Sequence, residues 1–303
     1  MKIVVTGGAG FIGSHLTDAL ARNGNEVIVI DNLSAGKKEN VARDAEFIAK
    51  DILKESIVQE LAGTDAVFHL AADPDVRASA ERPAKSFELN AIATFRLLES
   101  CRKGGVKHVV FTSTSVVYGD AETVPTPENY PCTPISNYGA SKLACEAYCS
   151  SYANSYGIKA TVMRYANIFG ERSNHGVMYD FFHKLKKNPK ELEILGDGNQ
   201  DKSYLHVEDC VSATLAAFEK QEKIYDVFNV GSSEKQKVKK IAEIVCGGMK
   251  LKPKFRYTGG ERGWVGDVKL MLLDTKKIRS LGWKQNVSLE EGINRYVKWL
   301  SKQ

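Results

Sequence analysis

The chain has 303 residues, of which 43% are apolar and 26% are charged. These values exclude a disordered, collagen-like or coiled-coil protein, and the length indicates two domains or one large α/β unit with an appendage. The formal net charge of +5 is mild and mixed along the chain, which does not indicate a nucleic-acid-binding protein but would help to attract an anionic small molecule.

The six cysteines form no CxxC pair, and Cys145 and Cys149 have no histidine nearby. We therefore expect free thiols in a reducing compartment and no metal site. No run of about 20 apolar residues occurs, so we expect no membrane span. The apolar start of the chain is interrupted by TGGAG, with no signal-peptide cleavage site after it. A cytoplasmic protein is predicted.

Short β-branched runs alternate with helical patterns in the first half of the chain. This alternation predicts βαβ units and a doubly wound parallel sheet, and the nearly continuous apolar runs predict a sheet covered on both faces. The expected strands are 2–6, 26–30, 45–49, 66–70, 108–113 and 160–165, with one more at 226–231. The expected helices lie near 11–23, 54–62, 84–104 and 136–156.

Beyond Tyr165 the loops lengthen and charged residues become more frequent. Residues 1–166 with about 203–232 are predicted to form the domain of the large sheet. Residues of about 167–202 and 233–303 are predicted to form a smaller mixed domain, with a cleft between the two. The lysine-rich run from Lys235 to Lys240 is interpreted as a solvated helix face.

A glycine-rich turn follows the first expected strand and opens a helix. Gly7, Gly10 and Gly13 have a GxxGxxG spacing, which permits a tight turn and lets backbone amides approach a pyrophosphate at the positive end of the helix. Asp31 ends the second strand, where a carboxylate accepts both ribose hydroxyls of adenosine and repels a 2′-phosphate. The pattern predicts a dinucleotide site that favours NAD over NADP.

Asp51 and Ile52 follow the third expected strand. A carboxylate at this point can meet the amino group of adenine, although an aspartate here is also typical of a helix cap.

Tyr138 and Lys142 lie four residues apart in a helical pattern, which puts both on one face of the helix. A neighbouring ammonium lowers the pKa of a phenol, and such a phenol can act as general base for an alcohol. A Ser/Thr cluster at 112–115 ends a strand, where parallel-sheet enzymes bind ligands, and one of its hydroxyls can share the substrate proton with Tyr138. Taken singly, these features also fit a surface helix pair and a turn-forming cluster.

Together these segments resemble the extended short-chain dehydrogenases/reductases, and among them the nucleotide-sugar epimerases of the UDP-glucose 4-epimerase type. The similar segments are TGGAGFIG at 6–13, Asp31-Asn32-Leu33, His69 to Ala72, Asn90, SVVYG at 115–119, YGASK at 138–142 and RYANIFG at 164–170. The resemblance implies a Rossmann-type sheet with a smaller nucleotide-sugar-binding domain, and a tightly held NAD that is not consumed. It also implies a homodimer through the helices at about 85–104 and 136–156.

The resemblance also implies roles for individual residues. Tyr138 would be the general base for the sugar 4-hydroxyl, Thr114 its hydroxyl partner with Ser113 as the alternative, and Lys142 would hold the nicotinamide ribose. The cofactor-binding residues from the motifs and the resemblance are Gly7, Gly10, Phe11, Ile12, Gly13, Asp31, Asn32, Ser34, Gly36, Asp51, Ile52, Leu70, Ala71, Ala72, Asn90, Thr112, Tyr138, Lys142, Tyr165 and Ala166. The substrate-binding residues are Ser113, Thr114, Asn167, Lys202, Arg262, Asp267 and Met271.

The substrate side departs from the family's pattern. Lys202 stands where an arginine is usual, which keeps the charge but loses the bidentate fork. Arg262 and Asp267 match the family's uridine segment with two extra residues between them. Met271 would then lie beside the sugar's 2-substituent, where a tyrosine excludes N-acetyl sugars and a cysteine admits them. The alternative for Met271 is packing in the core of the smaller domain.

The predicted function is UDP-glucose 4-epimerase, an NAD-dependent isomerase that interconverts UDP-glucose and UDP-galactose through a transient 4-keto sugar. The alternatives are an epimerase of another nucleotide sugar such as UDP-N-acetylglucosamine, a nucleotide-sugar dehydratase or decarboxylase, and a non-catalytic NAD-sensing protein. In dehydratases of the family the two residues after the catalytic threonine are Asp-Glu, and in decarboxylases a Glu lies two residues after it, where this chain has Ser115 and Val116. Non-catalytic relatives generally lose the Tyr–Lys pair that this chain keeps.

Overall fold

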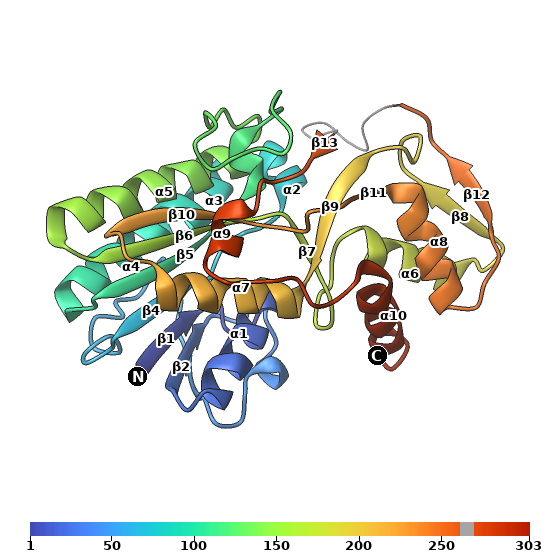
Figure 1. Cartoon of the computed structure of the whole chain (residues 1–303). Helices are drawn as coiled ribbons and strands as arrows, with labels where there is room; N and C mark the ends of the chain where they lie inside the picture. Colours follow the sequence, from blue (N-terminus) through green and yellow to red (C-terminus); the bar gives the residue numbers. More distant parts are fainter. Residues whose placement is uncertain (261–269) are drawn as a thin grey trace.

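The computed structural model describes residues 1–260 and 270–303, and its larger part is built on a seven-stranded parallel sheet (Figure 1). The strand order is β10-β6-β5-β4-β1-β2-β3. These strands are β1 Lys2–Thr6, β2 Glu26–Asp31, β3 Glu46–Ala49, β4 Ala66–His69, β5 His108–Thr114, β6 Lys159–Tyr165 and β10 Tyr225–Val230. Each predicted strand is present, and the doubly wound Rossmann-type sheet is confirmed.

Helices cover both faces of this sheet, which explains why its strands are apolar on both sides (Figure 1). On one face, α1 (Phe11–Arg22) and α7 (Val207–Lys220) pack on alternate strand residues such as Val5 and Phe68. On the other face, α4 (Ala93–Gly104) and α5 (Asn137–Tyr156) pack on the intervening residues such as Val4 and Val67. All seven residues of β5 are buried.

The helix expected near 54–62 does not form, and that prediction was wrong. The segment is a series of turns, in which the amides of Lys54 and Glu55 both bond to the carbonyl of Asp51. Ile57 and Leu61 still enter the core, with 1% and 0% of their surface exposed. The apolar spacing that suggested a helix therefore serves turns that bury two side chains.

The helix expected at 84–104 is present in three pieces. Helix α3 (Pro83–Phe87) runs into a π-helical turn, Glu88–Ile92, which continues into α4. A short helix, α2 (Val76–Glu81), precedes them, and a 3-10 turn, Lys38–Asn40, follows β2.

The smaller part joins a mixed sheet to three helices of the described chain (Figure 1). Its strands are β7 Asn167–Phe169, β9 Asp201–His206, β11 Lys235–Lys237 and β13 Leu270–Met271, with β8 Glu191–Ile194 and β12 Lys254–Tyr257 as a separate parallel pair. Its helices are α6 Val177–Lys187, α8 Val238–Gly248 and α10 Leu289–Leu300. A short helix between β13 and α10, α9 Lys276–Ser280, packs instead on the large sheet, where Ile278 joins the core under α7. Strand β9 belongs to the sheet of the smaller part, whereas α7 and β10, which follow it in the chain, belong to the larger part. The chain therefore passes from one part to the other near residues 206 and 231. The two-domain division stays a prediction.

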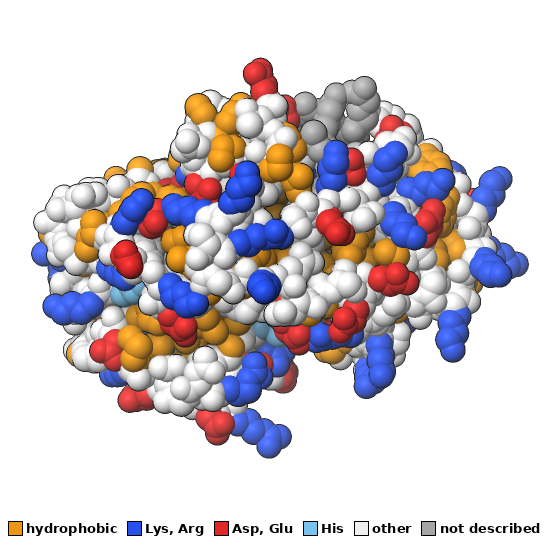
Figure 2. All heavy atoms as spheres, in the orientation of Figure 1, with side chains coloured by type: hydrophobic (Ala, Val, Ile, Leu, Met, Phe, Trp, Pro, Cys, Tyr) orange, Lys and Arg blue, Asp and Glu red, His pale blue; other side chains and the backbone are white. Residues whose placement is uncertain are grey.

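Among the described residues, no helix is both long and apolar enough to cross a membrane. All six cysteines are free, and five of them are buried. On the face shown in Figure 2, lysine and arginine side chains project around the outer rim of the smaller part, with aspartate and glutamate interspersed. The run from Lys235 to Lys240 is half strand and half helix, and its four lysines are exposed while Val238 is buried.

Candidate active site

The glycine-rich turn holds α1 against the sheet by backbone contacts. Gly7 has φ +72°, and a Cβ at this position would lie 2.5 Å from the amide nitrogen of Ala71. A Cβ at Gly13 would lie 2.2 Å from the carbonyl oxygen of Gly7. These close approaches leave a cradle that a side chain would fill.

Helix α1 begins at this cradle, and no side chain caps its first backbone amides by a hydrogen bond. Its N-cap is Gly10, and its first turn, at Phe11 and Ile12, contains no acidic residue. The positive end of the helix dipole is therefore available to a phosphate group. This donor set fits the diphosphate of a dinucleotide.

Asp31 is fixed beside the same turn. The carboxylate is 8% exposed, and its two oxygens accept hydrogen bonds from the amides of Ala9 (3.0 Å) and Leu33 (2.8 Å). Each carboxylate oxygen can accept a further bond. The neighbouring Asn32 is exposed, and its side chain accepts a hydrogen bond from the amide of Ser34 (3.0 Å). Gly36 packs closely on the glycine-rich turn, because a Cβ there would lie 2.8 Å from the carbonyl carbon of Ala9.

Asp31→Ser combined with Asn32→Arg is expected to move cofactor preference from NAD towards NADP. Hydrogen bonds to a charged group contribute about 1.5–3 kcal/mol, so the affinity for NAD should fall about 10- to 100-fold. Isothermal titration calorimetry with both cofactors measures this change. Asp44→Ser, which removes an exposed carboxylate of the same domain, controls for net charge. Wild-type protein that binds NADP as tightly as NAD would contradict the role of Asp31.

Asp51 has a local structural role in addition to its predicted contact with adenine. Its carboxylate accepts from the amide of Leu53 (3.0 Å) and pairs with Lys54 at 3.4 Å. Ile52 is 8% exposed and belongs to the core under β2 and β4. The adenine contact of both residues stays a prediction.

Tyr138, Lys142 and Thr114 meet at the carboxyl end of β5. Tyr138 lies in the first turn of α5, which Ser136 caps by accepting from the amide of Gly139 (3.1 Å). The Tyr138 side chain is 9% exposed and lies beside that of Thr114. The ammonium of Lys142, 3% exposed, donates to the carbonyl of Thr112 at 2.9 Å.

The lowering of the Tyr138 pKa by Lys142, expected from the sequence, stays a prediction. Burial raises the pKa of Tyr138, the hydrogen bond from Thr114 lowers it, and weaker contributions from Cys145 and Asp73 raise it. The ammonium of Lys142 is directed to the carbonyl of Thr112 and lies 4.8 Å from the ring centroid of Phe111. Burial lowers the pKa of Lys142 itself.

The other hydroxyls of the cluster have separate partners. Ser113 donates to Glu146, and Thr112 donates to the carbonyl of His69 at 3.0 Å. Thr114 is therefore the hydroxyl that meets Tyr138, while Ser113 belongs to a buried ionic network.

Asn90 lies in the π-helical turn, which the sequence did not reveal. The side chain is 1% exposed, accepts from the amide of Asp73 (2.9 Å) and donates to Ser141 (3.1 Å). It thereby connects α5 to the loop after β4, where Leu70, Ala71 and Ala72 are half-buried. Such turns occur often at functional sites, but Glu88–Ile92 carries no composition that distinguishes it from ordinary helix.

Tyr165 ends β6 beside this site, and Ala166 follows it. The Tyr165 hydroxyl shares a hydrogen bond with Thr214 of α7 at 2.7 Å and its ring lies in the core, so only its backbone is left to face a cofactor. Ala166 bonds through its amide to the carbonyl of Val230 at 2.8 Å and is half-buried.

The predicted substrate residues are only partly described. Asn167 donates to the carbonyl of Ser203 at 3.0 Å. Lys202 on β9 is paired in register with Met271 on β13. Met271 is half-buried against Val117 and Tyr118, in a cluster that also contains Ala166. Arg262 and Asp267 lie outside the described residues.

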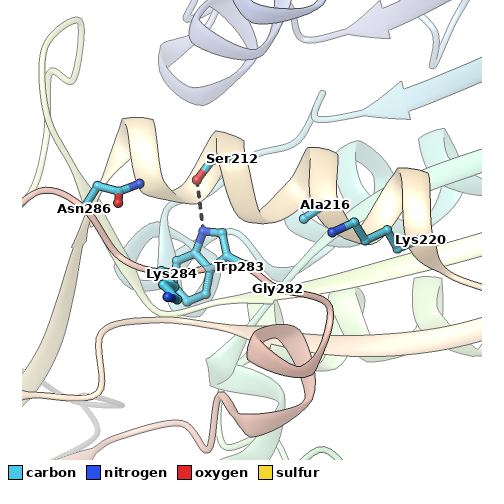
Figure 3. A pocket seen from close by; sticks show the side chains of 7 residues that line it. All are labelled: Ser212, Ala216, Lys220, Gly282, Trp283, Lys284 and Asn286. Atoms are coloured by element: carbon cyan, nitrogen blue, oxygen red, sulfur yellow. Dashed lines mark hydrogen bonds between the residues drawn. The ribbon is translucent and has the colours of Figure 1, made fainter.

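One cavity of about 380 Å³ lies apart from these residues, along α7 (Figure 3). Its lining includes Trp283, whose indole donates to Ser212 at 2.9 Å, and the lysines Lys220 and Lys284. Its lining contains no predicted site residue, so the candidate site rests on the strand ends instead.

Comparisons with known proteins agree with this arrangement. The model of the NAD dependent epimerase/dehydratase family matches residues 3–231. The UDP-glucose 4-epimerase of Mycolicibacterium smegmatis is 33% identical over 99% of this chain and 98% of its own. A solved UDP-galactose 4-epimerase is 45% identical, with a TM-score of 0.91 over 100% of this chain and 99% of its own. The UDP-glucose 4-epimerase of Thermotoga maritima, solved with UDP-glucose, is 39% identical with the same TM-score and coverage.

Other similar structures act on different sugars. They include a UDP-N-acetylglucosamine 4-epimerase of Methanobrevibacter ruminantium, 31% identical, and a UDP-glucuronic acid 4-epimerase of Bacillus cereus, 29% identical. A dTDP-glucose 4,6-dehydratase of Streptomyces venezuelae is 27% identical. The resemblance to extended short-chain dehydrogenases/reductases is thus confirmed, and the glycine cradle, Asp31 and the Tyr138–Lys142 pair fit NAD as the cofactor. The chain belongs to the NAD-dependent epimerase/dehydratase family.

Proposed function

We propose that the protein is a UDP-sugar 4-epimerase that interconverts UDP-glucose and UDP-galactose. The observation that carries the proposal is that Tyr138 lies beside Thr114 at the carboxyl end of β5, with Lys142 one turn further along α5. This pair supplies a base and a positioning hydroxyl for one alcohol group of a substrate. The similarity to several 4-epimerases supports the same reaction.

Tyr138 acts on the 4-hydroxyl of the sugar. As phenolate it takes the hydroxyl proton while a hydride leaves carbon 4, and it returns the proton when the hydride comes back to the opposite face of the 4-keto sugar. Thr114 orients that hydroxyl, and Lys142, held at Thr112, is placed to bind the nicotinamide ribose. NAD, held by the glycine cradle and Asp31, would accept the hydride and later return it, so that no external cofactor would be consumed.

A dehydratase or decarboxylase is the second candidate by similarity. These reactions need a further acid or base beside the threonine, and this chain has Ser115 and Val116 there. Ser115 is 8% exposed and Val116 is half-buried, and neither side chain titrates in the physiological range. The residues at this point therefore favour epimerisation.

A panel of nucleotide sugars tests the proposal. Purified protein is incubated with UDP-glucose, UDP-galactose, UDP-glucuronic acid and the two N-acetylated hexoses, without added NAD, and the products are separated by chromatography. Interconversion of the first two is the expected result. A 4-keto-6-deoxy or pentose product, or turnover only with added NAD, would refute the proposed reaction.

Met271 is proposed to line the sugar pocket beside the 2-substituent. It lies next to Lys202 in register and packs against Val117 and Tyr118, close to the turn that follows Thr114. An unbranched methionine changes rotamer to fit irregular space, so the N-acetylated pair should turn over slowly but measurably. The same half-buried contact would result if Met271 only packed in the apolar cluster and did not face the sugar. Variants of Met271 separate these two explanations.

Met271→Tyr is expected to abolish turnover of the N-acetylated sugars, and Met271→Ala to raise it about 10-fold, the effect of one or two methylenes in a pocket. Both variants should keep UDP-galactose turnover close to the wild-type rate. Ratios of kcat/KM for the two sugar pairs measure the change. Leu273→Ala, in the same apolar cluster, controls for packing. Unchanged ratios in both Met271 variants would place the pocket wall at another residue.

We also propose that the protein forms a homodimer through α4 and α5. Their outer faces, with α3, carry an exposed aromatic strip made of Phe87, Phe95, Tyr148 and Tyr156, which are 38–54% exposed. Phe95 and Tyr148 lie side by side, with ring centroids 5.4 Å apart. Exposed aromatic patches of this kind are typical of protein interfaces.

A further inference from the structure

A buried ion pair joins α5 to β6 directly behind Thr114. Glu146 and Arg164 are 2% and 5% exposed. The guanidinium donates from Nη2 to Glu146 Oε2 at 2.6 Å and from Nε to the two carboxylate oxygens at 3.0 and 3.2 Å. Two desolvated charges stabilise a fold little more than an apolar pair of the same volume, so their presence here calls for a role other than stability.

Glu146 belongs to the face of α5 that carries the catalytic residues. Tyr138, Lys142 and Glu146 follow at intervals of four residues and therefore line one side of the helix. Lys142 donates to the carbonyl of Thr112, and Glu146 accepts from the hydroxyl of Ser113. The helix is thus attached to the two residues of β5 that immediately precede Thr114.

Arg164 holds the chain on the other side of Thr114. Thr114 caps the 3-10 turn Ser115–Tyr118 by accepting from the amide of Val116 at 3.2 Å. The hydroxyl of Tyr118, which ends this turn, accepts from Arg164 Nη1 at 2.8 Å and donates to Asn229 at 2.8 Å. The guanidinium also lies 4.7 Å from the ring centroid of Tyr118.

One ion pair therefore contacts the chain on both sides of Thr114: Glu146 holds Ser113 before it, and Arg164 holds Tyr118 at the end of the turn after it. In the sheet, Ser113 and Arg164 are also direct partners across β5 and β6. We propose that Glu146 and Arg164 are positioning residues, which keep the hydroxyl of Thr114 in contact with the phenol of Tyr138. This inference rests on the proposed function, since that reaction gives the contact its chemical role.

Three variants test the proposal. Glu146→Gln removes the charge at constant shape, Tyr118→Phe removes only the hydroxyl that Arg164 contacts, and Glu99→Gln is the matched control. Glu99, on α4, accepts from Tyr152 of α5 at 2.6 Å and pairs with Arg102, and neither of these partners lies on β5. Rates are divided by the number of NAD-loaded sites, so that a loss of folded protein does not count as a loss of activity.

A small displacement of reacting groups costs as much as about 10²-fold in rate, so kcat of Glu146→Gln should fall about 10- to 100-fold with KM unchanged. Tyr118→Phe should show a smaller fall, and Glu99→Gln none. The contact with Thr114 lowers the pKa of Tyr138, and Tyr138 acts as phenolate. Losing the contact with Thr114 should therefore raise the apparent pKa of Tyr138. The acidic limb of the plot of kcat against pH should then move to higher pH.

Equal kcat per NAD-loaded site and an unmoved acidic limb in Glu146→Gln would overturn the proposal. If that variant does not fold, the same two readouts in Tyr118→Phe decide. If wild-type protein epimerises no UDP-sugar, the proposed function fails while the positioning role is still measurable by ¹³Cζ-tyrosine NMR. The Tyr138 resonance, assigned by its absence in Tyr138→Phe, should then move in Glu146→Gln and Tyr118→Phe but not in Glu99→Gln, and an unmoved resonance overturns the inference.

Discussion

Tyr138→Phe is expected to lower kcat by about 10²–10⁴-fold, the usual contribution of a general base, while NAD remains bound. The phenol is the group placed to remove the alcohol proton, whereas the cofactor is held mainly by the glycine cradle and Asp31. The ring stays in place because the change removes only the hydroxyl that meets Thr114. Turnover of UDP-galactose and the NAD content of the purified variant measure the two effects separately.

Two further variants locate this effect. Tyr152→Phe removes a hydroxyl from the same helix, one that donates to Glu99 and lies away from the strand ends, and it should keep normal turnover. Thr114→Ala should be less severe than Tyr138→Phe, since a positioning hydroxyl contributes less than the base. Near-normal activity of Tyr138→Phe would assign the base to another group.

The large sheet was predictable because its sequence signals are local and mutually consistent. Alternating residues such as Val4 and Val5 enter opposite cores under helices, so both faces of each strand must be apolar, and Gly7 and Asp31 mark the turns at the strand ends. The segment 54–62 shows the limit of this reasoning. Its apolar residues Ile57 and Leu61 fit helical spacing but are buried by turns, and periodicity alone does not distinguish the two.

The sequence predicted which residues form the site, but not which hydrogen bonds their side chains make. The motif placed Tyr138 and Lys142 on one helix face, yet the direction of the ammonium depends on the carbonyl of Thr112, which belongs to another element. In the same way, the sequence left Ser113 open as the alternative to Thr114. Only the position of Glu146 two helical turns beyond Tyr138 commits Ser113 to the ionic network. Such choices depend on tertiary contacts that no local pattern records.

Gly13→Ala is expected to destabilise the protein and to remove most of its affinity for NAD. Alanine normally stabilises a helix relative to glycine by about 0.5–1 kcal/mol. Here its Cβ would lie 2.2 Å from the carbonyl oxygen of Gly7, a backbone atom that cannot rotate away. Overpacking of this kind costs about 1–3 kcal/mol, which exceeds the helical gain, and relief requires α1 to move off the glycine turn.

That movement would displace the amides at the start of α1 from the cofactor's diphosphate, so binding should suffer more than folding. Thermal unfolding followed by circular dichroism, with and without NAD, separates the two effects: the melting temperature should fall, and its rise on adding NAD should disappear. Gly247→Ala is the matched control, because Gly247 is also helical and a Cβ there has no atom within 4 Å in the described structure. The control should show unchanged or slightly raised stability and normal NAD binding. A Gly13→Ala protein that binds NAD normally would mean that the approach of α1 to Gly7 does not define the cofactor site.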